Sequence, residues 1–152
     1  MTNNGMPIKG FRGDYSFLSN FQACPIEYEG IRYKSAEAAF QAQKTDDPDQ
    51  KAKFANIGPK DAKYLGRRVS LRPDWESIKL QKMYEIVYRK FAQNPDLAEK
   101  LLATDDRYLE ETNAWRDTFW GVDARTGYGQ NHLGKILMKI RSELRSAKEA
   151  ES

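Results

Sequence analysis

Cysteine and histidine are almost absent from this chain, with Cys24 and His132 the only examples among 152 residues. A single cysteine excludes an intramolecular disulfide framework and fits a reducing compartment. A single histidine leaves Ser-His and Cys-His catalytic pairs, and histidine-rich metal sites, without the residues they need. Cys24 has no basic motif near it in the sequence that would activate its thiol. We therefore expect no metal and no other cofactor.

Long hydrophobic runs and a strong charge of one sign are also missing. No apolar run approaches the ~20 residues of a membrane span, and the first residues, Met-Thr-Asn-Asn-Gly-Met-Pro, lack the apolar segment of a signal peptide. The 25 Lys and Arg against 22 Asp and Glu leave a net charge of +3. This balance does not indicate nucleic-acid or membrane binding by bulk charge. We expect a soluble cytoplasmic protein without a membrane partner, and the sequence does not indicate its oligomeric state.

The residues that are present suit a folded, helix-rich α+β domain with a few short antiparallel strands. With 39% hydrophobic and 12% aromatic residues, the chain can build one core, which we expect to span residues 1–146, with a frayed tail over 147–152. Residues 26–33, Ile-Glu-Tyr-Glu-Gly-Ile-Arg-Tyr, are typical of a hairpin that turns at Glu29-Gly30. Capping residues, prolines and apolar spacing predict helices over 36–44, 47–58, 59–66 and 75–91, from about 95, and over 131–144. Residues 108–129 should form short strands and loops.

The expected helix 36–44 carries several chemical groups on one face. Phe40, Gln41 and Lys44 lie three, four and seven residues after Glu37, so a carboxylate, a ring, an amide and an amine share that face. One interpretation is a solvated polar stripe. The other is that these groups line a cavity, which the surrounding alanines favour because they allow close packing on several sides.

Residues 110–121 combine two tryptophans, a phenylalanine, an arginine, an asparagine and three carboxylates. Aromatic density in an irregular segment often fills a core, and this is one interpretation of Trp120. Aromatic rings beside carboxylates are also suitable walls for a planar base and suitable acid–base groups for its glycosidic bond. Tryptophan neighbours could desolvate Asp117 and tune it toward neutral pH.

A glycine-rich turn, Gly127–Asn131, leads into the last expected helix. Exposed N–H groups at such a turn suit a phosphate, although turns of this kind are common before helices. Two interpretations therefore stay open for this turn, with Gly129 and Asn131, and for Arg67 and Arg72. These residues either hold a phosphate or have ordinary structural and solvated roles.

Several blocks of the chain are specific in combination. They are Phe17–Phe21, Tyr33–Glu37, Phe40–Lys44, Gly66-Arg67, Leu71–Trp75, Trp115–Asp117, Phe119–Gly121 and Asn131–Gly134. In this order and at about this spacing they resemble the NADAR family (YbiA-like proteins). The resemblance covers nearly the whole chain, and although each block alone is weak, together they are highly specific.

The resemblance implies an N-glycosidase that hydrolyses the bond between C1 of a ribose and an exocyclic or base nitrogen. It implies two candidate substrates, the early phosphoribosylated pyrimidine intermediates of riboflavin synthesis and ADP-ribose on the amino group of guanine in nucleic acid. The family's functional positions fall on Glu37, Trp75 and Asp117, and its motif lysine falls on Lys44. We expect Glu37, Lys44 and Asp117 to be catalytic. The residues expected to bind substrate are Trp75, Asn20, Phe21, Trp120, Arg67, Arg72, Gly129 and Asn131.

Residue chemistry leaves two mechanisms open for such a reaction. N-glycoside cleavage needs an acid for the departing nitrogen and a group that manages positive charge at C1. Glu37 and Asp117 can supply both by direct hydrolysis, or Lys44 can trap the opened sugar as a Schiff base, which is the route we favour. A non-enzymatic ADP-ribose or nucleotide-binding module is the alternative function. The presence of all three groups disfavours it. The expected partner is a small phosphoribosyl or ADP-ribosyl compound, and ADP-ribosylated nucleic acid is the other one considered.

Overall fold

A computed structural model describes residues 5–151 and divides them into two compact units. Unit 1 combines the segment that ends at Ser19 with the segment that begins at Pro95, and unit 2 is Asn20–Asn94. The elements are β1 (Ile8–Lys9), the 3-10 helix η1 (Gly13–Leu18), β2 (Ala23–Tyr28), β3 (Ile31–Ser35), α1 (Ala36–Ala42), α2 (Pro48–Ala52), α3 (Pro59–Gly66), α4 (Trp75–Ala92), α5 (Pro95–Leu102), β4 (Leu109–Glu110), β5 (Thr112–Asn113), β6 (Val122–Asp123) and α6 (His132–Ala150). The helix-rich α+β class is confirmed. None of the helices in residues 5–151 is both long and apolar enough to cross a membrane.

The predicted hairpin is confirmed in unit 2. Strands β2 and β3 pair antiparallel, with Tyr28 opposite Ile31. The two residues between the strands, Glu29 and Gly30, have φ values of 49° and 85°, as a tight primed turn requires. Alternate residues of β2, among them Ile26 and Tyr28, point inward and are buried.

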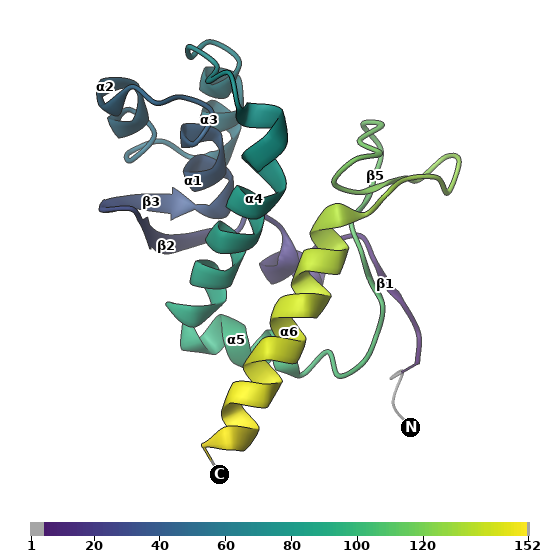
Figure 1. Cartoon of the computed structure of the whole chain (residues 1–152). Coiled ribbons are helices and arrows are strands. Elements are labelled where there is room, and N and C mark those ends of the chain that lie inside the picture. The colour runs from purple at the N-terminus through teal and green to yellow at the C-terminus, as the bar shows by residue number, and fades with distance from the viewer. Residues whose placement is uncertain (1–4, 152) are drawn as a thin grey trace. The chain divides into compact units, whose positions relative to one another are not determined.

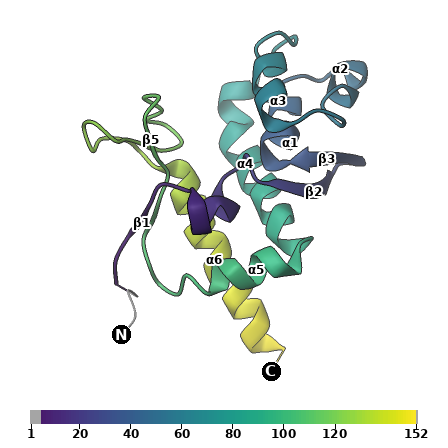
Figure 2. The ribbon, with the colours of Figure 1, turned by 180° about the vertical axis from the view of Figure 1, so that it is seen from behind.

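Helix α1 is the buried centre of unit 2. Ser35 caps its N-terminus, because the hydroxyl oxygen accepts a hydrogen bond from Ala38 N–H at 3.1 Å. The hairpin, α3 and α4 all pack against α1 (Figures 1 and 2), and every residue of this helix is buried. The helix ends at Ala42 rather than at Lys44. Lys44 lies in the following turn, where its N–H donates to the Gln41 carbonyl at 3.2 Å.

Helix α4 (Trp75–Ala92) begins where the sequence predicts, whereas α2 (Pro48–Ala52) is shorter than predicted. Helix α4 begins at Trp75 as expected and buries an apolar stripe that includes Met83, Val87 and Phe91. Helix α2 ends at Ala52, six residues before the predicted end. It buries none of its residues, so no apolar face holds the chain in a longer helix.

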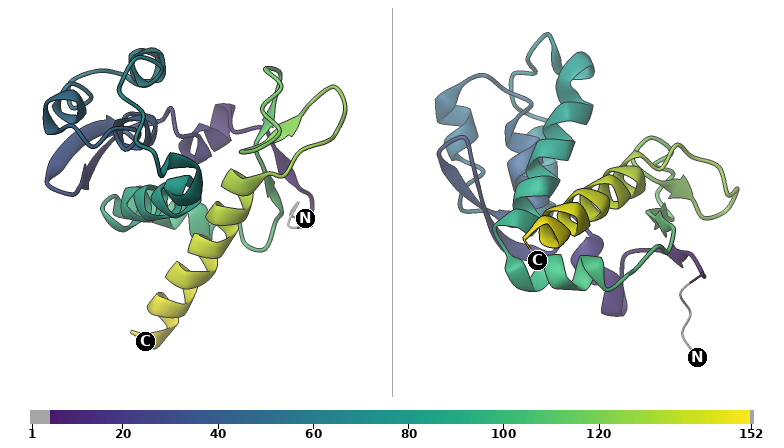
Figure 3. Two further views of the ribbon diagram at one scale, coloured as in Figure 1. Left: turned by 45° about the horizontal axis from the view of Figure 1, so that its top comes forward. Right: turned by 60° about the horizontal axis from the view of Figure 1, so that its bottom comes forward.

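Helix α6, yellow in Figure 3, is the longest helix described in unit 1. Helix α6 buries Leu133, Leu137 and Ile140 on one side. It continues to Ala150, so the predicted frayed tail is wrong for residues 147–150; Ser152 lies outside the described residues. The residues Ala147 to Ala150 are alanine, lysine and glutamate, which are strong helix formers and extend the helix beyond its apolar face.

The expectation that the short strands would be antiparallel holds only for the hairpin. Strand β1 pairs parallel with β4, and β5 pairs parallel with β6. The first of these pairs joins Ile8 to Leu109. Local sequence patterns indicate only strands that are joined by a turn, so they could not show a pairing across a hundred residues.

Candidate active site

Glu37 is held in the first turn of α1 by two hydrogen bonds. Its backbone N–H donates to the Asn20 carbonyl at 3.0 Å. The Gln41 side chain, one turn further on, donates from Nε2 to Glu37 Oε2 at 2.7 Å. Glu37 is only 9% exposed, so its carboxylate lies in a largely desolvated place with a fixed direction.

Lys44 is half-buried and lies close to positive and negative groups. Burial lowers the pKa of its ammonium, Glu37 raises it, and the cations of Arg67, Lys63 and Lys79 lower it further. An amine whose pKa is lowered in this way is more often neutral and therefore nucleophilic. The same cluster of cations suits an anionic ligand.

Trp75 lies inside unit 2, where it packs against a residue of α1. Its ring centroid is 5.1 Å from that of Phe40, with the ring planes tilted by 53°. Trp75 is buried, which agrees with a core role at the start of α4.

Asn20 and Phe21 precede β2 in unit 2. Asn20 is buried, and its Nδ2 donates to the sulfur of Met83 at 3.3 Å. Its Oδ1 has no hydrogen-bond partner. Phe21 is 44% exposed and can therefore contact a ligand.

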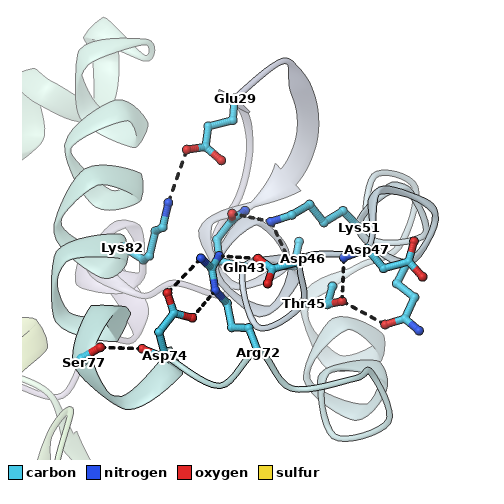
Figure 4. A network of polar contacts seen from close by, with 12 residues as sticks. Glu29, Gln43, Thr45, Asp46, Asp47, Lys51, Arg72, Asp74, Ser77 and Lys82 are labelled. Atoms are coloured by element: carbon cyan, nitrogen blue, oxygen red, sulfur yellow. Dashed lines mark hydrogen bonds and ion pairs between the residues drawn. The ribbon is translucent and has the colours of Figure 1, made fainter.

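Arg72 is engaged in a network of polar contacts that Figure 4 shows from close by. Its guanidinium forms two hydrogen bonds with Asp74, at 2.7 and 3.2 Å, and an ion pair with Asp46 at 3.3 Å. Its backbone N–H donates to the Lys44 carbonyl at 2.8 Å. Arg72 thus connects Asp46, two residues after Lys44, to Asp74, the residue before Trp75. A phosphate at its guanidinium would have to displace both carboxylates.

Asp117 lies in unit 1, in a loop that the buried Asn113 fixes. Asn113 Oδ1 accepts from Asp117 N–H at 2.9 Å, and Asn113 Nδ2 donates to the Asp117 carbonyl at 2.9 Å. One carboxylate oxygen, Asp117 Oδ1, accepts from the backbone N–H groups of Phe119 and Trp120 at 3.0 and 2.9 Å. That oxygen orders the turn, so any chemistry of Asp117 falls to its other oxygen.

The aromatic residues after Asp117 pack on one another. The Phe119 and Trp120 rings meet edge to face, with centroids 4.8 Å apart. The His132 ring lies 4.5 Å from Phe119 and 6.4 Å from Trp120, centroid to centroid. Trp120 is therefore part of an aromatic cluster at the beginning of α6, and it is only partly buried.

The turn at residues 127–131 has structural partners for its donors. The N–H groups of residues 130–133 donate to the carbonyls of Thr118, Gly121, Phe119 and Trp120. Gly129 lies so close to the backbone of Gly121 and Val122 that a Cβ would overlap it. The N–H groups of Gly127, Tyr128, Gln130 and Asn131 are therefore already hydrogen-bonded within the protein.

Asn131 is buried, and both polar atoms of its side chain form hydrogen bonds within unit 1. Its Oδ1 accepts from Glu111 N–H at 3.0 Å, and its Nδ2 donates to the Leu109 carbonyl at 2.9 Å and the Tyr108 hydroxyl at 3.1 Å. Its φ of 54° is in the left-handed region, which asparagine tolerates better than most residues. These contacts fix the loop before α6 and use the groups that would bind a phosphate.

The predicted site residues are divided between the two units. Unit 2 holds Glu37, Lys44, Trp75 and Arg67, whereas Asp117 belongs to unit 1. Sequence reasoning did not single out Lys63 or Lys79 as neighbours of Lys44. The spacing of four between Lys63 and Arg67 indicates a shared helical face, but only the packing of α3 on α1 places that face near Lys44.

No group of three or more His, Cys, Asp or Glu side chains among residues 5–151 could hold a metal ion.

Comparisons with known proteins give consistent matches over most of the chain. The family model described as the NADAR domain matches residues 9–145. The chain is 39% identical over 134 residues to N-glycosidase YbiA of Escherichia coli (strain K12), covering 86% of this chain and 82% of that protein. It is 41% identical over 143 residues to a riboflavin biosynthesis protein of Vibrio vulnificus, covering 91% of this chain but 38% of that longer protein. The solved NMR structure of E. coli YbiA matches with a TM-score of 0.85 at 34% identity, covering 97% of this chain and 89% of that one.

Proposed function

This chain belongs to the NADAR domain family, and we propose on that basis that it cleaves the C1–N bond of a phosphorylated ribosylamine. The enzyme class, a hydrolase of N-glycosidic bonds, follows from family membership together with relatives named N-glycosidase. The observation that carries the proposal is Glu37 beside Lys44, an amine whose pKa burial lowers. We place the reaction in the cytoplasm, where the thiol of the one cysteine in the chain stays reduced.

Lys44 is the proposed nucleophile. As the ribosylamine ring opens, the ring oxygen takes a proton and C1 becomes an iminium carbon. The Lys44 amine adds to C1, and the base nitrogen departs with a proton and the electron pair of the C1–N bond. Water then hydrolyses the lysine–sugar Schiff base and releases the sugar aldehyde.

Borohydride trapping tests this route. Borohydride added during turnover should leave a reduced sugar adduct on Lys44, detected by mass spectrometry of peptides, and Lys44→Arg should abolish the adduct while keeping the charge. Full activity of Lys44→Arg, with no adduct on the parent protein, would return the chemistry to direct hydrolysis by Glu37 and Asp117.

The substrate phosphate is assigned to unit 2. Lys63, Arg67 and Lys79 are close enough to Lys44 to lower its pKa, and a charge-assisted contact to a phosphate contributes ~1.5–3 kcal/mol. Removing the phosphate from the substrate should therefore lower kcat/KM about tenfold or more. Arg67→Gln should lower kcat/KM for the phosphorylated substrate only. With a small phosphoribosyl substrate, Arg68→Gln is the matched control, because the neighbouring Arg68 stacks on Tyr64 instead.

Two candidate substrates fit the proposed reaction. The relative named as a riboflavin biosynthesis protein favours a phosphoribosylamino-pyrimidine. A basic, exposed segment favours ADP-ribosylated guanine in nucleic acid. Residues 59–68 carry four basic residues and one acidic residue, and Tyr64 within this segment is exposed. Incubation of the protein with each compound, followed by mass-spectrometric detection of free base or sugar, decides between them. Binding of both without release of either product would support a nucleotide-binding module instead.

A further inference from the structure

Gln41 is a buried amide of which only one end is hydrogen-bonded. Its Nε2 donates to Glu37 Oε2 at 2.7 Å. Its Oε1 is buried and has no hydrogen-bond partner. A buried carbonyl without a donor is unfavourable, so an arrangement that keeps it invites a functional explanation.

Gly66, the last residue of α3, makes room for this amide. A Cβ added to Gly66 would overlap Oε1 and Cδ of Gln41. Glycine is a poor helix former, so its place inside α3 is not explained by helix propensity. The close approach of the Gln41 side chain explains it.

The orientation of the amide favours the ionised form of Glu37. A carboxylate accepts the hydrogen bond that the Gln41 Nε2 donates. With the amide turned over, Oε1 would face Glu37, and two acceptors would meet unless the carboxyl kept its proton. A hydrogen bond to a carboxylate is stronger than one to a neutral carboxyl, so the observed orientation favours an ionised Glu37.

We propose that Gln41, seated against Gly66, is a positioning residue that keeps Glu37 ionised, so that Glu37 accepts the proton that the nucleophile loses. The assignment of this proton rests on the proposed function. Whether the nucleophile is water or the Lys44 amine, the proton that it loses on bonding to C1 passes to a Glu37 oxygen. The nucleophile then bonds to C1, and the C1–N electron pair leaves with the nitrogen, which takes its proton from a different acid.

Other charged groups also act on this part of unit 2. They are Lys44 after α1, Lys51 of α2, Lys63 and Arg67 at α3, and Lys79 of α4. Of these, Lys44 interacts electrostatically with Glu37 and favours its ionised form, and substitution of Gly66 leaves all five groups in the protein. A change that follows that substitution therefore reports on the Gln41 amide.

The test measures the pKa of the Glu37 carboxyl by NMR titration of its side-chain carbon in the full chain. In Gly66→Ala the added methyl displaces the Gln41 amide, and loss of the donor should raise the pKa of Glu37 by about one unit. Gln41→Met, which removes the donor and keeps a side chain of similar length, should do the same. Gly58→Ala is the control at the other end of α3, where a Cβ would meet nothing within 4 Å.

Kinetics provide the second readout. If Glu37 accepts a proton, the acidic limb of the kcat profile should move to higher pH in Gly66→Ala and Gln41→Met by the same amount as the pKa. A shift of the alkaline limb alone would make Glu37 the acid and overturn the proposal. An unchanged pKa of Glu37 in both variants would also overturn it. If the pKa rises but the wild-type protein releases no product, the positioning role stands and the proposed function fails.

Discussion

Lys90 is the most deeply buried cation described in the chain. It lies on α4, is 1% exposed, and places its amine 5.2 Å from the centre of the Phe91 ring. Burial lowers the pKa of its ammonium to about 8, against an ordinary value of 10.5, and the Cys24 thiol nearby partly opposes this shift. A lysine of this kind makes folding depend on pH.

We predict that Lys90 lowers stability below pH 8 and that the penalty disappears as pH rises. Below pH 8 the amine is charged in both states, and the buried charge costs free energy. Between pH 8 and 10.5 it is neutral when folded and charged when unfolded, so the unfolded state binds more protons and the free energy of unfolding rises with pH. The shift from 10.5 to about 8 corresponds to about 3 kcal/mol.

Urea unfolding of the wild-type protein and Lys90→Met between pH 7 and 10.5 measures this effect. The stability advantage of Lys90→Met should shrink by about 3 kcal/mol across the range. The difference between the two proteins cancels the titration of other groups. A constant difference would show that Lys90 titrates normally in the folded protein.

Asn131 provides a second prediction for a single residue. Asn131→Ala loses three side-chain hydrogen bonds and places a Cβ-bearing residue without a polar side chain at a φ of 54°. We expect it to lower the free energy of unfolding by about 3 kcal/mol. Asn131→Gly loses the same bonds but tolerates the backbone, so it should cost about 1 kcal/mol less. Equal losses in the two variants, measured by chemical denaturation, would exclude backbone strain.

At the scale of elements, the connection between α1 and α4 is fixed by Arg72. The guanidinium binds carboxylates on both sides, and the backbone N–H binds the Lys44 carbonyl. This connection sets where Lys44 leaves α1 and where α4 begins with Trp75. It therefore links a surface network to the proposed nucleophile.

We predict that Arg72→Lys lowers kcat/KM for phosphorylated and dephosphorylated substrates by the same factor, about tenfold. The lysine keeps the charge but cannot bind two carboxylates with a planar fork, so Lys44 is less well placed. Steady-state kinetics on the two substrates measure this. A loss restricted to the phosphorylated substrate would make Arg72 a phosphate ligand.

At the scale of the whole molecule, the candidate residues are divided between two units. Glu37, Lys44 and Trp75 belong to unit 2, and Asp117 and Trp120 belong to unit 1. The family model nevertheless matches residues 9–145 as one domain. A single family pattern therefore includes residues of both units.

We predict that hydrolysis by the whole protein survives an excess of EDTA. The proposed chemistry uses carboxylates and an amine, and the sequence holds one histidine and one cysteine as strong metal ligands. Product release should be the same, within error, with and without the chelator. Loss of activity that one added divalent metal restores would contradict the proposed mechanism.

The sequence by itself determined the local structure and the identity of the chemical groups. Glu29-Gly30 predicted the hairpin because few residue pairs tolerate two positive φ values in a tight turn. Pro59 and the spacing of Trp75, Met83 and Val87 predicted helices that the structure confirms. Glu37 and Gln41 were recognised as one face of a helix because helical spacing is a local property, whereas Lys44 lies in the turn after α1.

Only the tertiary structure decided which polar groups are already in use. The occupied N–H groups before α6 and the ion pair of Arg72 with Asp46 come from contacts that local spacing does not encode. The parallel pairing of Ile8 with Leu109 is of the same kind. The space that Gly66 leaves for Gln41 depends on the packing of α3 on α1. Local patterns fix backbone geometry over a few residues, whereas burial, and with it the lowered pKa values of Lys44 and Lys90, arises when distant segments exclude water.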